Sequence, residues 1–325
     1  MDCFASLAMT ATRTAIGQET EESPMTNRPA PSLVGRLWAG QTLPVVVVVT
    51  LVLAFWYAMV IPMNAQRLRT TFENNNQAYT FSDLAGAAFD MEKPNLPAPH
   101  QIVAEMQKTI VDMPMTSKRS LVYHGMITLE STLTGFIVGS LFGILLAILI
   151  VHMKSLERSL MPWIVMSQTI PILALAPMIV VIFNQFDVPS IAAKAAISAY
   201  LSFFPVTVGM VKGLRSPDPL QLDLMRTYSA SRWQTFFKLR LPASVPFLFT
   251  SLKVAVAASL VGAIVAEMTK SEDGGFGARL LAGSYYGQTI QIWAALMTAA
   301  LCACLLVALV GLADNLVARR MGAAR

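Results

Sequence analysis

Long apolar stretches separated by shorter polar segments dominate the chain. A helix needs about 20 mostly apolar residues to cross a hydrocarbon layer of about 30 Å, because each residue rises about 1.5 Å. Six stretches meet this requirement, approximately 43–63, 128–151, 160–184, 190–212, 243–267 and 291–313. Backbone polar groups in lipid must be satisfied within their own segment, so each stretch is expected to be helical. The pattern predicts an all-α, polytopic membrane protein with six transmembrane helices.

Composition supports a membrane location and narrows the function. Of the 325 residues, 55% are hydrophobic and 13% are charged, which is too apolar for an ordinary soluble domain. The net charge of +5 is not gathered into a basic cluster interleaved with aromatic residues, so no nucleic-acid partner is expected. Cys3, Cys302 and Cys304 form neither a disulfide framework nor a metal-binding spacing. The sequence therefore predicts no metal ion and no cofactor.

The placement of Lys and Arg favours one orientation in the membrane. Short loops that are rich in these residues stay in the cytoplasm. With the N-terminus inside, the cytoplasmic connections hold the larger share, including Lys212, Arg215, Arg226, Arg232, Lys238 and Arg240. The long segment after the first span also contains basic residues, but it exceeds the roughly 60-residue length beyond which loop charge loses its influence. Both termini are therefore predicted to be cytoplasmic.

The spans divide the chain into four parts. These are a cytoplasmic N-terminal tail (1–42), the first transmembrane helix (43–63), a periplasmic segment (64–125) and a five-helix core (126–318) with a long loop at 214–242. The tail lacks the apolar core of a signal peptide, and Met25 is a second possible translation start. In the periplasmic segment, the amphipathic stretch from Ile102 to Met113 predicts one interfacial helix.

The longest connection within the core carries the most specific pattern. Between Asp218 and Ser229, apolar and polar residues alternate at helical spacing, which predicts a short helix at the membrane surface. Leu224 and Tyr228 stand one turn apart and share a face of that helix. Pro242 then suits the first turn of the next helix, where its missing amide hydrogen is not needed, so the connection is expected to end at Leu241-Pro242.

This connection resembles the signature loop of importer permeases, which reads Glu-Ala-Ala, three residues, Gly, nine residues, Ile, one residue, Leu-Pro. Ser229 occupies the Gly place of this pattern. Only Gly adopts a positive φ without cost, so Ser229 is expected to make the local turn less permissive. In the family the loop forms a coupling helix that docks into a groove of an ATPase. The resemblance implies that role here for Asp223, Leu224, Met225, Tyr228, Ser229, Leu239, Leu241 and Pro242.

The resemblance extends over roughly Pro97 to Ala318. It is to the ATP-binding cassette permeases that import nitrate, sulfonates, taurine and thiamine pyrimidine precursors, and it is carried further by Leu96-Pro97-Ala98-Pro99, Ile170-Pro171, Ala176-Pro177 and Ala266-Glu267. It implies a type I importer permease fold in a bacterial inner membrane. The implied function is to form the translocation path for a small solute, either an anion or a pyrimidine precursor. These motifs do not separate the two kinds of substrate.

Four partners follow from the same resemblance. They are two copies of a cytoplasmic ATP-binding subunit, a second permease chain forming a homodimer, and a periplasmic substrate-binding protein that docks near 64–127 and 269–290, all in or on a lipid bilayer. The chain contains no Gly-Lys pair and therefore no phosphate-binding loop of the ATPase kind, so it is predicted not to be an enzyme. A self-sufficient secondary transporter or channel is the alternative, although no internal repeat supports it.

Some residues within the spans are candidates for the translocation path. Pro171 and Pro177 free backbone carbonyls and either contact the path or only bend the third span. Lys253 reaches the interface, pairs with another residue, or faces the path and attracts an anion. Glu267 is expected at the outer boundary as a solvated carboxylate, with a gating contact as the alternative. Gly135, Gly139 and Gly143 predict close packing against another helix.

Overall fold

The computed structural model describes residues 42–321, which contain helices and no strand. The chain divides into two units, Met1–Ala54 and Phe55–Arg325. The described part of the first unit is the beginning of helix α3 (Thr42–Asn74), where Val45 to Val49 are exposed, as expected for a lipid-facing surface. The predicted tail and the possible start at Met25 lie outside the described residues.

Five helices are long and apolar enough to cross a membrane, and a bent pair supplies a sixth span if it counts as one. The five are α3, α6 (Leu121–His152), α9 (Ser190–Leu214), the helical run Arg232–Thr269 that contains α12 (Leu241–Thr269), and α14 (Thr289–Arg320). All five were predicted from hydropathy. Their observed ends extend beyond the predicted ones because helices continue past the lipid layer.

The predicted third span is not a continuous helix. It consists of α7 (Lys154–Ser167) and α8 (Ile172–Gln185), which meet at an angle of 101°. Proline has no amide hydrogen and disfavours the helical conformation at the preceding residue. The first helix ends at Ser167, with its C-cap at Gln168, and Pro171 becomes the N-cap of the second helix after a short turn. Pro177 lies inside α8, which runs through it without a break.

The segment after α3 contains more helix than the sequence indicated. In place of one interfacial helix there are α4 (Phe81–Phe89), α5 (Pro99–Gln107) and the π-helical turn η1 (Lys108–Asp112). The reason is tertiary, because α3 continues to Asn74 and packs against this segment through a cluster formed by Val60, Leu68, Leu84, Ala88 and Ala98. A polar helix of this kind is stabilised by the partner it covers and not by its own hydropathy.

Asn64 fixes the segment in front of α5. Its side chain is fully buried, its amide donates to the carbonyl of Leu96 at 2.9 Å, and its Oδ1 accepts from the backbone amide of Asn95 at 2.7 Å. The indole of Trp56 donates to the carbonyl of Pro97 at 3.1 Å. These contacts explain why Leu96-Pro97-Ala98 has a defined path although it is not itself regular structure; Pro99 is already the first residue of α5.

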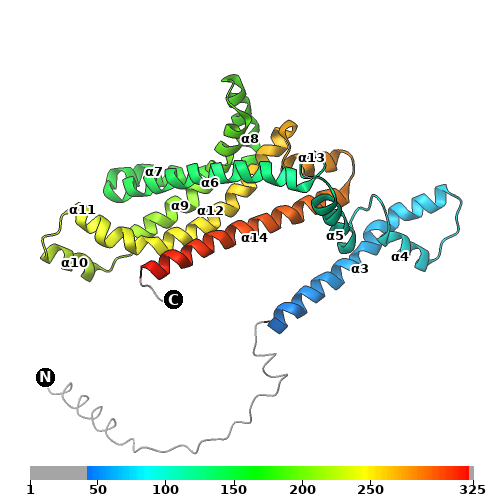
Figure 1. The fold of residues 1–325 in the computed structure, drawn as a ribbon, viewed down its shortest axis with the longest axis horizontal. Coiled ribbons are helices and arrows are strands. Elements are labelled where there is room, and N and C mark those ends of the chain that lie inside the picture. Colours follow the sequence, from blue (N-terminus) through cyan, green and yellow to red (C-terminus); the bar gives the residue numbers. More distant parts are fainter. Residues whose placement is uncertain (1–41, 322–325) are drawn as a thin grey trace, which may run out of the picture. The chain divides into compact units, whose positions relative to one another are not determined.

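The core is a layer of three helices with α9 in the middle, flanked by α6 and α12, and α14 lies along α12 (Figure 1). The glycine stripe of α6 makes this possible. A Cβ atom on Gly135, Gly139 or Gly143 would lie 2.7 Å from the backbone carbonyl oxygen of Ala195, Ala199 or Phe203, respectively. The backbones of α6 and α9 therefore touch, and the stripe has the packing role predicted from its spacing.

Replacing one of these glycines is expected to separate α6 from α9. Gly139→Ala should destabilise the protein by about 1–3 kcal/mol, because overpacked residues force backbone shifts. The matched control is Gly86→Ala, since a Cβ there meets nothing within 4 Å. The measurement is the thermal unfolding midpoint in one detergent. Equal midpoints for the two variants would contradict the close contact.

Candidate functional site

The loop between α9 and α12 projects a short helix that is not covered by the rest of the chain. Helix α10 (Pro219–Thr227) has no buried residue, and its apolar row remains exposed, with Leu220 at 78%, Leu224 at 55% and Tyr228 at 77%. Pro219 occupies the first turn, and the Asp218 carboxylate accepts from the backbone amide of Leu220 at 2.9 Å. Such a cap stabilises a helix that has no tertiary support.

The end of α10 is also fixed by hydrogen bonds. The amide of Ser229 donates to the carbonyl of Arg226 at 2.8 Å, and the amide of Ala230 donates to the carbonyl of Met225 at 2.9 Å. This is the Schellman arrangement, which places a left-handed residue directly after the helix. Ser229 has φ of +50°, so the residue in the Gly place of the loop motif indeed adopts the conformation that favours glycine. The sequence pattern was therefore right to indicate a position at which glycine would be favoured over Ser229.

The connection ends differently from the prediction. A helical path resumes at α11 (Arg232–Thr235), continues through the π-helical turn η2 (Phe236–Arg240) and enters α12 without a break. In that turn the amide of Leu241 donates to the carbonyl of Phe236. Because Pro242 has no amide to donate, the chain can shift register there without losing a hydrogen bond. Leu241 and Pro242 are therefore inside a helical run that begins at Arg232, and Leu239 lies in the π turn.

An ion pair holds the start of this loop to the neighbouring helix α7. The two guanidinium nitrogens of Arg215 each lie 2.7 Å from a carboxylate oxygen of Glu157, a two-point geometry. The hydrogen bond that Arg215 donates to Glu157 raises the pKa of Arg215 above its ordinary value. The segment that contains α10 is thus connected to the core at both ends, by the Arg215–Glu157 pair before it and by the helical run Arg232–Thr269 after it.

Ser229→Gly is expected to stabilise the end of α10. The left-handed conformation costs a residue with a Cβ about 1–2 kcal/mol, part of which is offset by the larger freedom of glycine in the unfolded chain. A gain of about 0.5–1 kcal/mol corresponds to roughly two- to fivefold slower hydrogen exchange at the Ala230 amide. Faster exchange in the variant would show that Ser229 makes a compensating contact.

The opposite end of the core carries a buried carboxylate. Glu267, near the end of α12, is 0% exposed; its Oε2 accepts from the Thr128 hydroxyl at 3.0 Å and from the Gly277 amide at 2.9 Å. The expectation of a solvated carboxylate at this position was wrong. The chain folds back after α12, through the 3₁₀ turn η3 (Ser271–Asp273) into α13 (Phe276–Tyr285), and this return covers Glu267.

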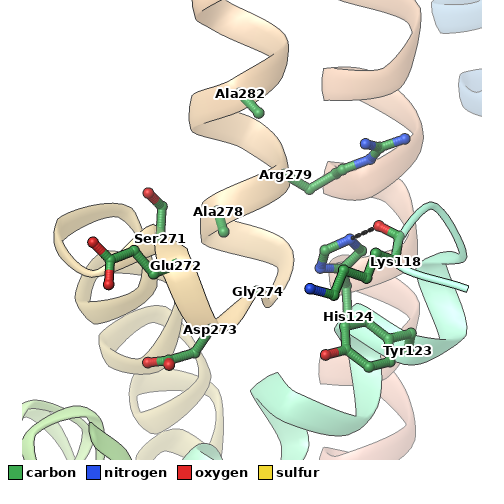
Figure 2. Close-up of a pocket in the computed structure, with 10 residues that line it drawn as sticks. All are labelled: Lys118, Tyr123, His124, Ser271, Glu272, Asp273, Gly274, Ala278, Arg279 and Ala282. Atoms are coloured by element: carbon green, nitrogen blue, oxygen red, sulfur yellow. Dashed lines mark hydrogen bonds between the residues drawn. The ribbon is translucent and has the colours of Figure 1, made fainter. Parts of the chain in front are cut away.

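The returning turn is anchored to α6 by its backbone amides. Gly275 donates to His124 Nδ1 at 3.0 Å, and Phe276 donates to the Thr128 hydroxyl at 2.9 Å. His124 Nε2 lies 3.0 Å from the carbonyl of Lys118, so its hydrogen is on Nε2 and Nδ1 is the acceptor (Figure 2). Gly274 and Gly275 have φ of +88° and +109°, and a Cβ on Gly275 would collide with the Glu267 carboxylate. Both glycines are required by this geometry.

A lysine that sequence reasoning passed over lies beside this turn. The Lys194 side chain, from α9, is 3% exposed, and its ammonium lies 3.4 Å from Asp273 Oδ2. Burial acts to raise the pKa of Asp273, but the hydroxyl of Ser190 and the positive charge of Lys194 outweigh it, so the pKa lies below its ordinary value. Lys194 could have been recognised from the sequence, because it is a charged residue inside a predicted span. Lys253 was selected by that same criterion.

Lys253 has a partner within the described part of the chain. Its ammonium lies 2.8 Å from Asp314 Oδ2, on α14, where the Asp314 side chain is buried and that of Lys253 is partly exposed. The sequence left open whether Lys253 reaches the interface, pairs with another residue or faces the path; in the structure it forms an ion pair. Asp314 was not recognised as the partner because the last predicted span ended one residue before it, whereas α14 continues to Arg320.

An open groove of about 540 Å³ lies between α9 and α12. Its lining is mainly apolar and includes the aromatic rings of Phe204 and Phe247, the hydroxyls of Thr250 and Ser251, and one basic residue, Lys212. None of the four residues predicted from sequence for the path, Pro171, Pro177, Lys253 and Glu267, is among the residues that line this groove.

The Lys253–Asp314 pair can be tested by a double-mutant cycle. Lys253→Met is expected to destabilise the protein by about 2 kcal/mol, less than the roughly 3–5 kcal/mol for breaking a fully buried pair, because Lys253 is partly exposed. Lys253→Met with Asp314→Leu should recover most of this loss, since replacing both charges by apolar side chains leaves no desolvated charge. Unfolding free energies of the four proteins give the coupling. Additive effects would show that the pair contributes nothing.

Comparisons with known proteins agree with this architecture. A family model described as "Binding-protein-dependent transport system inner membrane component" matches residues 139–323. A probable ABC transporter permease protein of Haemophilus influenzae is 33% identical over 176 residues, covering 54% of this chain and 70% of the relative. The formylaminopyrimidine transport permease protein ThiX of Halalkalibacterium halodurans is 35% identical over 179 residues, covering 55% and 67%. The putative aliphatic sulfonates transport permease protein SsuC of Bacillus subtilis is 27% identical over 202 residues, covering 62% and 69%.

The helical membrane-spanning core and these matches define a permease subunit. The chain belongs to the family of binding-protein-dependent transport system inner membrane components, the permeases of ATP-binding cassette importers. It is a transport subunit of the inner membrane and not an enzyme, and in such systems it associates with a separate ATPase chain and a substrate-binding protein. The prediction of family and function is confirmed over the alternative of a self-sufficient transporter.

Proposed function

We propose that α10 is the helix through which this permease receives the conformational change of its ATP-binding subunit. The observation that carries the proposal is the exposed row of Leu220, Leu224 and Tyr228 on a helix that is capped at both ends. An apolar row exposed on a soluble projection is typical of a surface that a partner covers. A helix with fixed ends transmits a displacement to the core, whereas a flexible loop would change conformation without moving the core.

The same proposal sets the orientation. The α10 end carries Lys212, Arg215, Arg226 and Arg232, which supports a cytoplasmic position by the positive-inside rule. The last helix, α14, returns towards this end, because Asp314 near its C-terminus pairs with Lys253 in the first half of α12. The C-terminus is thus proposed to be cytoplasmic. The N-terminal tail is proposed to be on the same side, because one span, α3, lies between it and the segment proposed to be periplasmic.

Two permease chains, most simply two copies of this one, are proposed to form the path together with two ATP-binding subunits. The groove between α9 and α12 supports this, because it is open on the surface of one chain and a second chain could close it. A binding protein would deliver the solute at the end that carries α4, α5 and α13.

The solute is proposed to be small, either an anion such as nitrate, a sulfonate or taurine, or a pyrimidine precursor. The lining of the groove favours the pyrimidine precursor. Phe204 and Phe247 offer faces for stacking a flat ring, and Lys212 is the single charged residue of the lining. The relative ThiX carries the name of a formylaminopyrimidine permease, which is consistent with this choice.

Docking through α10 is tested by co-purification with the neighbouring ATP-binding subunit. Leu224→Arg with Tyr228→Arg should weaken capture by roughly 30-fold or more, because losing even one buried apolar anchor costs about 2 kcal/mol or more in such interfaces. The matched control is Tyr285→Arg with Tyr286→Arg, two equally exposed residues at the end of α13, far from α10 (Figure 1). Undiminished capture by the α10 variant, or equal loss in the control, would refute the proposal.

A further inference from the structure

Three charged groups share one small region at the end of the core opposite α10. Lys194 from α9 and Glu267 from α12 are both buried, and Asp273 lies in the turn η3. One cation thus stands beside two carboxylates. A charge in apolar surroundings is costly unless it is paired and hydrogen-bonded, so how these three groups share their contacts affects the stability of the whole turn.

The contacts among the three groups are incomplete. Lys194 lies 3.4 Å from Asp273 Oδ2, which is longer than the roughly 2.7–2.9 Å of a good hydrogen bond between an ammonium and a carboxylate. Glu267 uses Oε2 for Thr128 and Gly277, but Oε1 has no hydrogen-bond partner among the described residues. Both Lys194 and Glu267 contact the returning segment, Lys194 through Asp273 and Glu267 through the Gly277 amide. The ammonium is therefore paired with the surface acid while the buried acid is only half satisfied.

The turn is built so that Asp273 can move while its surroundings stay fixed. The amides of Gly275, Phe276 and Gly277 are held by His124, Thr128 and Glu267. Asp273 is separated from this anchor by Gly274, whose φ of +88° lies in a backbone region that glycine visits without cost. Its carboxylate contacts Ser190 and Lys194 of α9. Releasing two side-chain contacts is enough to free it.

Asp273 also separates two cavities. It lines a pocket of about 410 Å³ with Lys118, His124 and Arg279, and another of about 290 Å³ with Glu130 and Lys194. Figure 2 shows Asp273 and Glu272 on one side of the turn, and His124, Lys118 and Arg279 on the other. A movement of Asp273 would change both cavities at once.

From this geometry we propose that Lys194 is a positioning residue of the transport cycle, whose ammonium passes from Asp273 to the free oxygen of Glu267 when the turn Lys270–Gly274 moves. Each state keeps the buried ammonium on a carboxylate, so the lysine is never left unpaired, and the two can differ little in free energy. In this proposal the state described here, with Asp273 held, is the closed one. The inference rests on the proposed orientation, in which this end receives the solute.

A disulfide between Ser190→Cys and Asp273→Cys tests the movement directly. Cys3, Cys302 and Cys304 are first replaced by serine, and the permease is purified both alone and with its ATP-binding subunit. Oxidation is expected to link the two cysteines, to lower MgATP hydrolysis by the complex at least fivefold, and to be reversed by dithiothreitol. Each single-cysteine variant should show no oxidant-sensitive loss.

Two results would overturn the proposal that Lys194 changes its carboxylate partner. One is failure of the disulfide to form in the permease alone, and the other is undiminished hydrolysis by the linked complex. The docking of α10 is measured separately, as the amount of ATP-binding subunit captured, so its failure is distinguished from failure of the switch.

Charge variants provide the second readout. Asp273→Asn should raise MgATP hydrolysis by the complex about fivefold, because Lys194 then has Glu267 as its remaining carboxylate partner. Glu267→Gln should lower hydrolysis about fivefold, because Lys194 then has Asp273 as its remaining carboxylate partner. In a Lys194→Met background both effects should fall below twofold, and Lys194→Arg should restore them. A purely structural role predicts instead that both variants change hydrolysis in the same direction and in proportion to their thermal unfolding midpoints, and that outcome would refute the proposal.

Discussion

The close approach of α6 and α12 to α9 is the contact on which the rest of the structure depends. Glycine on α6 faces backbone carbonyls of α9, and Gly262 of α12 faces the backbone of Ser198 in the same helix. In lipid there is no hydrophobic force between helices, so contact between backbones and hydrogen bonds must supply the attraction. The Ser198 hydroxyl donates to the carbonyl of Ser259, and the Ser259 hydroxyl donates to the carbonyl of Thr132, which joins the three helices.

This rigid layer connects two ends with different chemistry. At one end, α10 is exposed and apolar on one face and is fixed by backbone caps and by the Arg215–Glu157 pair. At the other end, buried charges and glycines hold a turn against α6 and α9. Because α9 and α12 run from one end to the other, a displacement of α10 acts on the helices that carry Lys194 and Glu267. If α10 docks on the ATP-binding subunit as proposed, that connection relates ATP hydrolysis to events at the opposite end.

Sequence patterns predicted well wherever local chemistry decides the structure. The spacing of apolar residues located five spans, and the glycine spacing in α6 indicated close packing. The loop motif located α10, and the serine at its Gly place drew attention to a residue that indeed has a positive φ. Prolines were recognised as bending the third span, although the 101° angle between α7 and α8 exceeds a kink. The assignment of α10 to ATPase docking stays a prediction.

The sequence by itself determined which segments cross the lipid, where the helices are interrupted and what family the chain belongs to, because hydropathy, proline chemistry and motif spacing are local properties. Only the tertiary structure decided which charges meet. Lys253 pairs with Asp314 and Lys194 with Asp273 across different helices, and Glu267 is covered by a turn that begins after its own helix ends. A charge in an apolar environment takes whichever partner the packing of the helices brings near it, and sequence separation contains no information about that distance.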